Sequence, residues 1–128
     1  RARGALFWHE DAEAIEAVRK FVDSSLKPDE TFFDFTNSCV LYYLFERDSP
    51  IREYEVPFYE SASAQREVIR RLEANPKVRA AIVPPTPLGR ISIDGLPNYE
   101  RAPLVYQYLT QHFHPAFEEA DVAIWVRN

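Results

Sequence analysis

Polar side chains that could bind a ligand follow two segments with strand-like sequences, Thr31–Phe35 and Val78–Val83. In open α/β sheets, ligands bind where the carboxyl ends of parallel strands meet, because the loops there converge on one edge. Carboxylate, amide and guanidinium groups in such loops suit hydrogen bonding to a sugar or an anion. The candidate ligand-binding residues are Asp34, Asn37, Asp94, Asn98 and Arg101.

A structural interpretation of the same residues stands beside the functional one. In this alternative, a residue of the turn Thr36–Ser38 caps the following helix, with Asn37 the named candidate. Asp34 would then lie on the solvated face of its strand, and the prolines from Pro84 onward would brace a loop. No spacing of these residues matches a catalytic signature, so the sequence assigns no catalytic residue.

Phosphate, metal and nucleophile sites find little support in the sequence. A phosphate-binding fingerprint needs glycines between the first strand and its helix, and none of the three glycines lies there. A metal site could draw on the pair His112 and His114, which diverge on a helix, and on the distant His9. Cys39 begins an apolar helical run and is predicted to be a small buried side chain. We therefore predict no metal and no cofactor.

Aromatic residues around the first helix–loop unit offer a second kind of surface. Tyr42 and Tyr43 lie on the predicted helix, and Tyr54, Phe58 and Tyr59 follow in the next loop. Such residues could stack on sugars or face a membrane. The alternative is that they anchor the core and the loop with satisfied hydroxyls.

Length and composition indicate one ordinary globular domain. The chain has 128 residues, of which 46% are hydrophobic and 27% charged, which is enough to bury a core. The net charge of −5 and the dispersion of basic residues along the sequence argue against nucleic acid and against strong lipid binding. No apolar stretch reaches the roughly 18 residues of a membrane span. A single cysteine allows no internal disulfide.

Helical and strand-like segments alternate along the sequence. Helices are predicted over Glu10–Leu26, Ser38–Phe45, about Ser61–Ala74 and Arg101–Phe113, and strands over Thr31–Phe35, Val78–Val83 and Val122–Val126. Alternation of this kind favours right-handed crossovers and a parallel sheet covered by helices. The predicted fold is a small three-layer α/β/α domain with a mainly parallel sheet of three to four strands. It is Rossmann-like but lacks a nucleotide fingerprint.

The beginning of the sequence suggests a piece of a longer protein. Residues 1–9 are predicted to be a linker, in which Leu6–Trp8 could add an edge strand, and 10–128 to be the single α/β domain. The sequence contains no methionine, so we expect a domain excised from a larger protein.

The segment Thr31–Tyr59 and later landmarks resemble a known type of protein. The matching residues are Thr31–Asn37, Tyr42–Leu44, Arg47–Pro50, Asp94–Asn98, Arg101–Leu104 and Tyr108–Leu109, and their order is followed from Asp11 to Arg127. This pattern is similar to the soluble C-terminal segment of bacterial polytopic membrane proteins of the dolichyl-phosphate-mannose-protein mannosyltransferase type. The landmarks are structural, and the resemblance carries over no catalytic residue.

The resemblance implies an extracytoplasmic accessory domain of a glycosyltransferase-like protein that uses a lipid-linked sugar donor. Its expected partners are the transmembrane portion of the same chain and, at most, a sugar or acceptor, with no catalysis by the domain itself. Two other hypotheses remain open from the residues. One is a small-molecule or glycan binding module that uses the strand-end loops, and the other is a small hydrolase that uses Asp34 as an acid or nucleophile.

Overall fold

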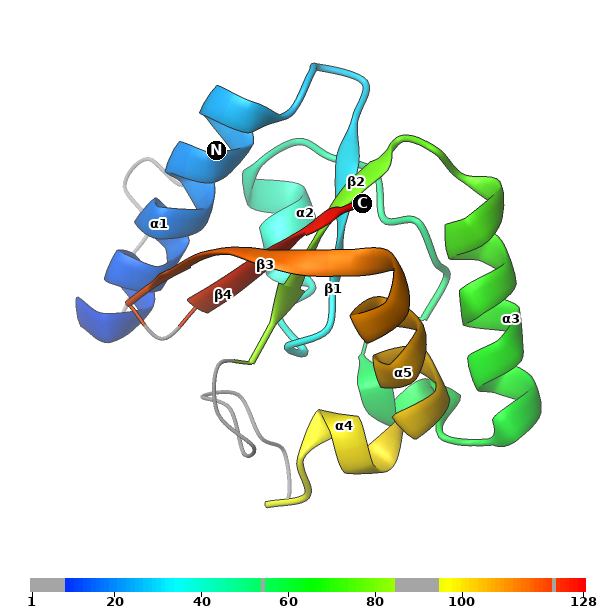
Figure 1. Cartoon of the computed structure of the whole chain (residues 1–128). Coiled ribbons are helices and arrows are strands. Elements are labelled where there is room, and N and C mark those ends of the chain that lie inside the picture. Colours follow the sequence, from blue (N-terminus) through cyan, green and yellow to red (C-terminus); the bar gives the residue numbers. More distant parts are fainter. Residues whose placement is uncertain (1–8, 54, 85–94, 121) are drawn as a thin grey trace.

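The computed structural model describes residues 9–53, 55–84, 95–120 and 122–128, and these form a mixed α/β fold (Figure 1). Their elements are α1 (His9–Ser25), β1 (Thr31–Asp34), α2 (Val40–Leu44), the 3₁₀ helix η1 (Val56–Tyr59), α3 (Ala62–Ala74), β2 (Val78–Val83), α4 (Asn98–Arg101), α5 (Pro103–His112), β3 (Phe113–Glu119) and β4 (Val122–Arg127).

The four strands form one mixed sheet in the order β1-β2-β4-β3. Only β1 and β2 are parallel, whereas β4 runs antiparallel to both β2 and β3. The predicted mainly parallel sheet is therefore wrong. The reason is β3, a strand that the sequence did not predict and that forms a hairpin with β4. Because the chain turns back after β3, β4 meets β2 in the opposite direction.

The sequence of β3 explains why it was missed. Its residues include His114, Pro115, Glu118 and Glu119, which are not typical strand formers, and most of them are exposed. An irregularity in its pairing with β4 lies between Pro115 and Phe117. Phe113 packs in the cluster that contains α3 and α5, whereas Phe117 packs against the other cluster. The extra residue reverses the side-chain alternation and gives the strand an aromatic anchor on each face.

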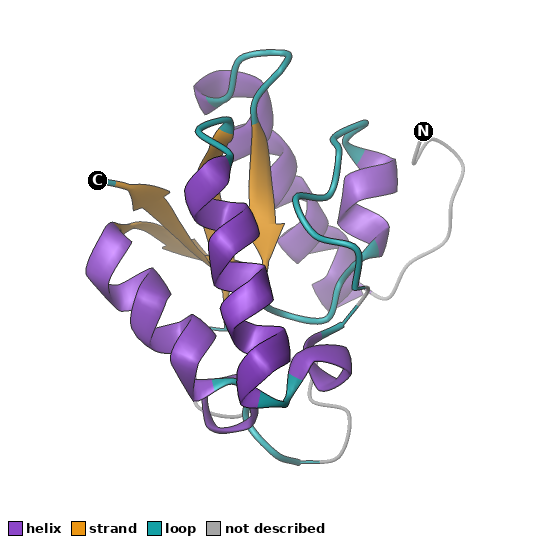
Figure 2. Cartoon of the chain, turned by 90° about the vertical axis from the view of Figure 1, so that its right-hand side faces the viewer, coloured by secondary structure: helices purple, strands orange, loops and turns teal. Residues whose placement is uncertain are grey.

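Hydrophobic residues form two clusters on opposite faces of the sheet. Neighbouring residues of a strand point to opposite faces, so Phe32 joins the cluster with α1 and α2, and Phe33 joins the one with α3 and α5. Figures 1 and 2 show the corresponding helices on either side of the strands. Phe32 and Phe33 are at most 1% exposed, and complete burial of such a side chain contributes about 1.5–3 kcal/mol.

Most predicted helices are confirmed, with changes at their ends. The helix expected over Glu10–Leu26 is α1, and Ser61 caps α3 by accepting a hydrogen bond from the Ala64 amide. The helix expected over Ser38–Phe45 is shorter, and Cys39 at its N-cap makes no side-chain cap hydrogen bond. The helix expected over Arg101–Phe113 begins at Pro103 instead, because Ala102 separates α5 from the short α4.

Several predictions fall on residues that the structure does not describe. The possible edge strand Leu6–Trp8 lies outside the described residues, as do most of the predicted linker and most of the long loop after Pro84. Among the helices that the structure describes, none has the length and apolar character needed to cross a bilayer.

Candidate functional site

The polar turn after β1 is built around the carboxylate of Asp34. Its Oδ1 accepts hydrogen bonds from the backbone N–H of Thr36 at 3.0 Å and from the Thr36 hydroxyl at 2.5 Å. Its Oδ2 accepts from the backbone N–H of Ser38 at 2.6 Å. Asp34 is only 8% exposed, so the interpretation that placed it on a solvated strand face is wrong. The carboxylate instead organises the loop that follows it.

Burial is the main influence on the ionisation of Asp34. Removal of the carboxyl from water raises its pKa above the usual range, and the negative charge of Glu55 acts in the same direction. The hydrogen bonds from Thr36 and Ser38 lower this pKa because they stabilise the charged form, but they only partly offset the burial. Asp34 is therefore a carboxyl that is easier to protonate than an exposed aspartate.

Asn37 and Asn98 meet at the same edge of the sheet, as the sequence predicted. The Asn37 Nδ2 donates to Asn98 Oδ1 at 3.2 Å, although 61 residues separate them along the chain. Asn37 Oδ1 accepts from the Val56 amide at 2.8 Å, and Asn98 Nδ2 donates to the Phe35 carbonyl at 2.7 Å. These bonds connect the turn after β1 to η1 and to α4. Both side chains are buried, and Asn37 braces three segments rather than capping α2.

Asn37 also has a special backbone conformation. Its φ is 65°, in the left-handed region that asparagine tolerates better than most residues. The residue type thus serves the backbone turn and the side-chain contacts at once.

Arg101 lies at the end of α4 and forms an ion pair with Glu60, which follows η1. The Arg101 side chain is 8% exposed and that of Glu60 is 47% exposed, so the pair lies at the boundary of the interior. The Arg101 guanidinium, predicted to bind a ligand, is thus bound to the carboxylate of Glu60 from the same chain. Asp94, the remaining predicted ligand-binding residue, lies outside the described residues.

The hydroxyl of Tyr42 completes the surroundings of Asp34. It accepts the Asp34 backbone N–H at 2.8 Å, while its ring stacks on Phe32 with centroids 4.7 Å apart. Burial, then the charge of Asp34, raises the pKa of this phenol. Tyr42 is thus a core and loop anchor with a bonded hydroxyl. By contrast, Tyr43 and Phe58 are 60% and 65% exposed.

Tyr59 presents a buried hydroxyl whose hydrogen bonding is incomplete. The residue is 1% exposed, and its hydroxyl has no hydrogen-bond partner among the described residues. Burial raises the pKa of this phenol well above its usual value, and the charges of Asp34 and Glu53 act in the same direction. The Oε2 atom of Glu53 is likewise buried without a partner in this part of the chain. Such groups destabilise a fold, because their lost hydration is not replaced.

Cys39 departs from its prediction, because it is exposed rather than buried. Its pKa is nevertheless raised, first by partial burial and then by the charges of Glu55 and Asp34. A raised pKa lowers the thiolate fraction, so these surroundings do not activate a nucleophile. Across residues 9–53, 55–84, 95–120 and 122–128, no group of three or more His, Cys, Asp or Glu side chains is placed to hold a metal ion.

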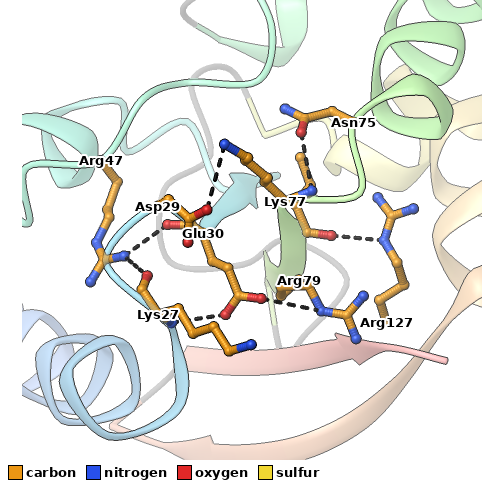
Figure 3. Close-up of polar contacts among 9 residues, drawn as sticks. Lys27, Asp29, Glu30, Arg47, Asn75, Lys77, Arg79 and Arg127 are labelled. Carbon is orange, nitrogen blue, oxygen red and sulfur yellow. Dashed lines mark hydrogen bonds and ion pairs between the residues drawn. The ribbon is translucent and has the colours of Figure 1, made fainter.

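Basic residues that are dispersed in the sequence gather at the opposite end of the parallel strands (Figure 3). Arg47 donates to the carbonyl oxygens of Lys27 at 2.5 Å and Glu30 at 2.8 Å. Arg127 donates to the carbonyls of Val78 and Leu72 at 2.7 and 3.0 Å. These guanidinium groups bond the backbone of neighbouring segments.

Carboxylates accompany the other cations at this end. The Lys77 Nζ lies 3.5 Å from Asp29, and the Arg79 Nε lies 4.0 Å from Glu30 (Figure 3). The contacts of this cluster fasten loops together, and they do not form a site of one charge sign.

The partners of Asp34 were only partly predictable. The sequence places Thr36 and Ser38 two and four residues after Asp34, a spacing that allows both to bond its carboxylate. We predicted a helix cap among these residues and so missed that role. Tyr42 was considered as a possible anchor with a satisfied hydroxyl, but nothing in the local pattern indicates that this hydroxyl bonds the Asp34 amide at the outer edge of β1.

A scan of protein-family models finds no match to the chain, and searches of curated proteins and of solved structures find no similar protein. The fold and site define a mixed α/β domain whose strand-end polar residues bind one another. Among the described residues, the groups that this arrangement offers at the carboxyl end of β1 are a buried carboxyl, two phenols and side-chain amides that are hydrogen-bonded within the chain.

Proposed function

We propose that this chain is the extracytoplasmic C-terminal accessory domain of an integral-membrane glycosyltransferase-like protein that uses a lipid-linked sugar donor. In this proposal the domain performs no catalysis itself. The observation that carries the proposal is that the polar residues at the carboxyl end of β1 form hydrogen bonds with one another and with the backbone of the chain. Asp34 accepts from Thr36 and Ser38, and Asn37 and Asn98 bond each other and the backbone of Val56 and Phe35.

The residues behind the sequence resemblance support this proposal through what they do in the fold. The Thr31 hydroxyl donates to the Asp48 carbonyl at 2.7 Å, and Arg47 bonds the turn that precedes β1. The Tyr42 hydroxyl accepts the Asp34 amide. Each of these three residues connects one segment of the backbone to another. A sequence pattern made of such residues suits a domain whose role is structural and which is attached to a larger protein.

The proposed partner is the transmembrane portion of the same chain, and contact with a sugar or an acceptor would be secondary. The proposed role is to cover the active site from the outer face or to contact the acceptor. The whole protein, rather than this domain, would be the transferase.

We also propose a three-layer α/β/α arrangement related to Rossmann-like domains. The support is the parallel β1–β2 pair and the presence of separate hydrophobic clusters with α1 and α2 in one and α3 and α5 in the other.

Two measurements test the main proposal. First, the reading frame upstream of Arg1 is sequenced and its hydropathy is plotted with a window of about 19 residues. Eight or more membrane spans with an acidic residue in the first outer loop would support it, and a soluble protein would refute it. Second, the 128-residue chain is incubated with polyprenyl-phosphate sugars and an acceptor peptide. Sugar transfer by the isolated chain would refute the accessory role.

The exposed aromatic residues favour a second candidate, a glycan binding module. Tyr43 on α2 and Phe58 on η1 project from elements that adjoin Asn37, since the Val56 amide bonds its side chain. Amide chemical shifts are followed while neutral sugars are added to the chain and to a Tyr43→Ala, Phe58→Ala control. Shifts around Asp34–Ser38 that disappear in the control would support binding, and a flat response across the panel would refute it.

A further inference from the structure

Thr36 has one hydroxyl hydrogen and two acceptors within reach. Its Oγ1 lies 2.5 Å from Asp34 Oδ1 and 3.1 Å from Ser38 Oγ. A hydroxyl donates one hydrogen bond at a time and can accept others, so the three groups form a chain with two possible directions. The direction is decided by the charge of Asp34. An ionised carboxylate only accepts hydrogen bonds, and a protonated one must also donate.

We propose that the Asp34–Thr36–Ser38 turn is a proton-responsive hydrogen-bond switch. When Asp34 is ionised, the Thr36 hydroxyl donates to Asp34 Oδ1. When Asp34 takes up a proton from solvent at Oδ1, the new O–H donates to Thr36 Oγ1, and the Thr36 hydrogen rotates to Ser38 Oγ. The only bond that forms is the O–H bond of the Asp34 carboxyl, with a proton supplied by solvent. The Thr36 hydroxyl keeps its own hydrogen and only rotates.

Of the other bonds in the turn, the one to Asp34 Oδ2 is kept in both states, whereas the bond from the Thr36 amide to Oδ1 is weakened by protonation because an acid hydroxyl is a poorer acceptor. Asp34 Oδ2 can still accept from the Ser38 amide at 2.6 Å when Oδ1 carries the proton, because a carboxylic acid retains a carbonyl oxygen. Asn37 therefore keeps its place, and with it the contacts to Val56 and Asn98. The switch reverses hydrogen bonds within the turn and leaves the docking of η1 and α4 intact.

Burial and the charge of Glu55 favour proton uptake by Asp34, and several other titratable groups lie around it. In the loop before η1, the negative charge of Glu55 raises the pKa of Asp34, and that of Glu53 raises the pKa of Tyr59. The Tyr42 hydroxyl on α2 bonds the Asp34 amide, and the charge of Asp34 also acts on Tyr59 of η1 and on the Cys39 thiol. Two of these groups are carboxylates and the others are neutral when protonated.

The effect on stability has a definite sign. The pKa of Asp34 is higher in the folded chain than its ordinary value of 3.8, so the folded state binds the proton more tightly than the unfolded state. From this group alone, stability is greatest below that ordinary value and decreases as the pH rises through the folded pKa. The titration window therefore lies between the ordinary value and the raised one.

The test follows the ¹³Cγ shift of Asp34 against pH in the whole chain and in three variants. Ser38→Ala removes the acceptor that the Thr36 hydrogen needs when Asp34 is neutral, so the acid dissociation constant of Asp34 should rise about three- to fivefold. Thr36→Ser keeps the hydroxyl and should leave the constant within about twofold of the parent. An unchanged constant in Ser38→Ala would overturn the proposal.

Thr36→Val provides the second, independent readout. If the hydroxyl serves both charge states, its removal weakens both, and the dissociation constant should stay within about twofold of the parent. If the hydroxyl serves only the carboxylate, the constant should fall about fivefold or more, which would refute the switch. Should Thr36→Val fail to fold, Ser38→Ala still decides, because the Ser38 backbone bond to Asp34 remains.

Discussion

Two tyrosines near Asp34 differ in the hydrogen bonding of their hydroxyls, and this difference gives a sharp stability prediction. Tyr42→Phe keeps the ring that stacks on Phe32 and removes the acceptor of the Asp34 amide, together with the hydrogen bond between the hydroxyl and Ser49. The amide is then left buried without a partner, which costs about 1–3 kcal/mol. Tyr59→Phe removes a hydroxyl that is buried without a partner among the described residues. It should be neutral or stabilise the chain by up to about 1 kcal/mol.

Urea unfolding at neutral pH measures both variants against the parent chain. Each is the control of the other, because both replace a tyrosine hydroxyl by hydrogen near the same carboxylate. Hydrogen exchange of the Asp34 amide adds a local readout and should accelerate in Tyr42→Phe alone. A Tyr59→Phe variant that loses as much stability as Tyr42→Phe would refute the reasoning. So would a Tyr42→Phe variant as stable as the parent.

Two further substitutions test the contacts between distant segments. Asn37→Gly suits the φ of 65° but removes the side-chain bonds to Val56 and Asn98, so urea unfolding should show a loss of about 2–3 kcal/mol. A loss under about 0.5 kcal/mol would mean that only the backbone conformation matters. Gln65→Met keeps the side-chain length but leaves the Leu104 amide at the start of α5 without its acceptor at 2.8 Å, so thermal unfolding should show a loss of about 1–3 kcal/mol. An unchanged Tm would contradict a capping role for Gln65.

Sequence patterns predicted the elements whose causes are local. Apolar spacing located α1 and α3, and the cap that Ser61 forms on α3 involves only the next three residues. The strands β1, β2 and β4 were found from short apolar runs. In these segments, the interactions that determine the element are between residues that are close together in the sequence.

Whether neighbouring strands run parallel or antiparallel depends on which strands pair, and the local sequence pattern does not show this. The strand β3 has a composition that does not favour strands, and it is stabilised by its hairpin with β4. Because that hairpin was not expected, the alternation of helices and strands suggested a parallel sheet. Pairing with β4 overrode the low strand preference of β3.

The sequence predicted that polar residues would meet after the strands, but it did not predict which partners they would bond. The rule for strand ends brought Asn37 and Asn98 together, and the structure confirms their contact. The spacing of Thr36 and Ser38 after Asp34 allowed their bonds to its carboxylate, although they were expected to cap a helix. The sequence could not show that Arg101 would face Glu60, because that contact depends on how η1 and α4 pack.

The outer edges of the sheet have a consequence for association with other chains. The N–H of Thr31 and of Phe35 bonds segments beside β2, so that of Asp34 points away from the sheet, where Tyr42 covers it. At the other edge, β3 carries Pro115, a pairing irregularity and two exposed glutamates. Proline, bulges and charge at an edge discourage a further strand from adding to a sheet. We therefore expect this domain to meet its neighbours through helices and loops, and to resist edge-to-edge aggregation even when many copies are crowded together.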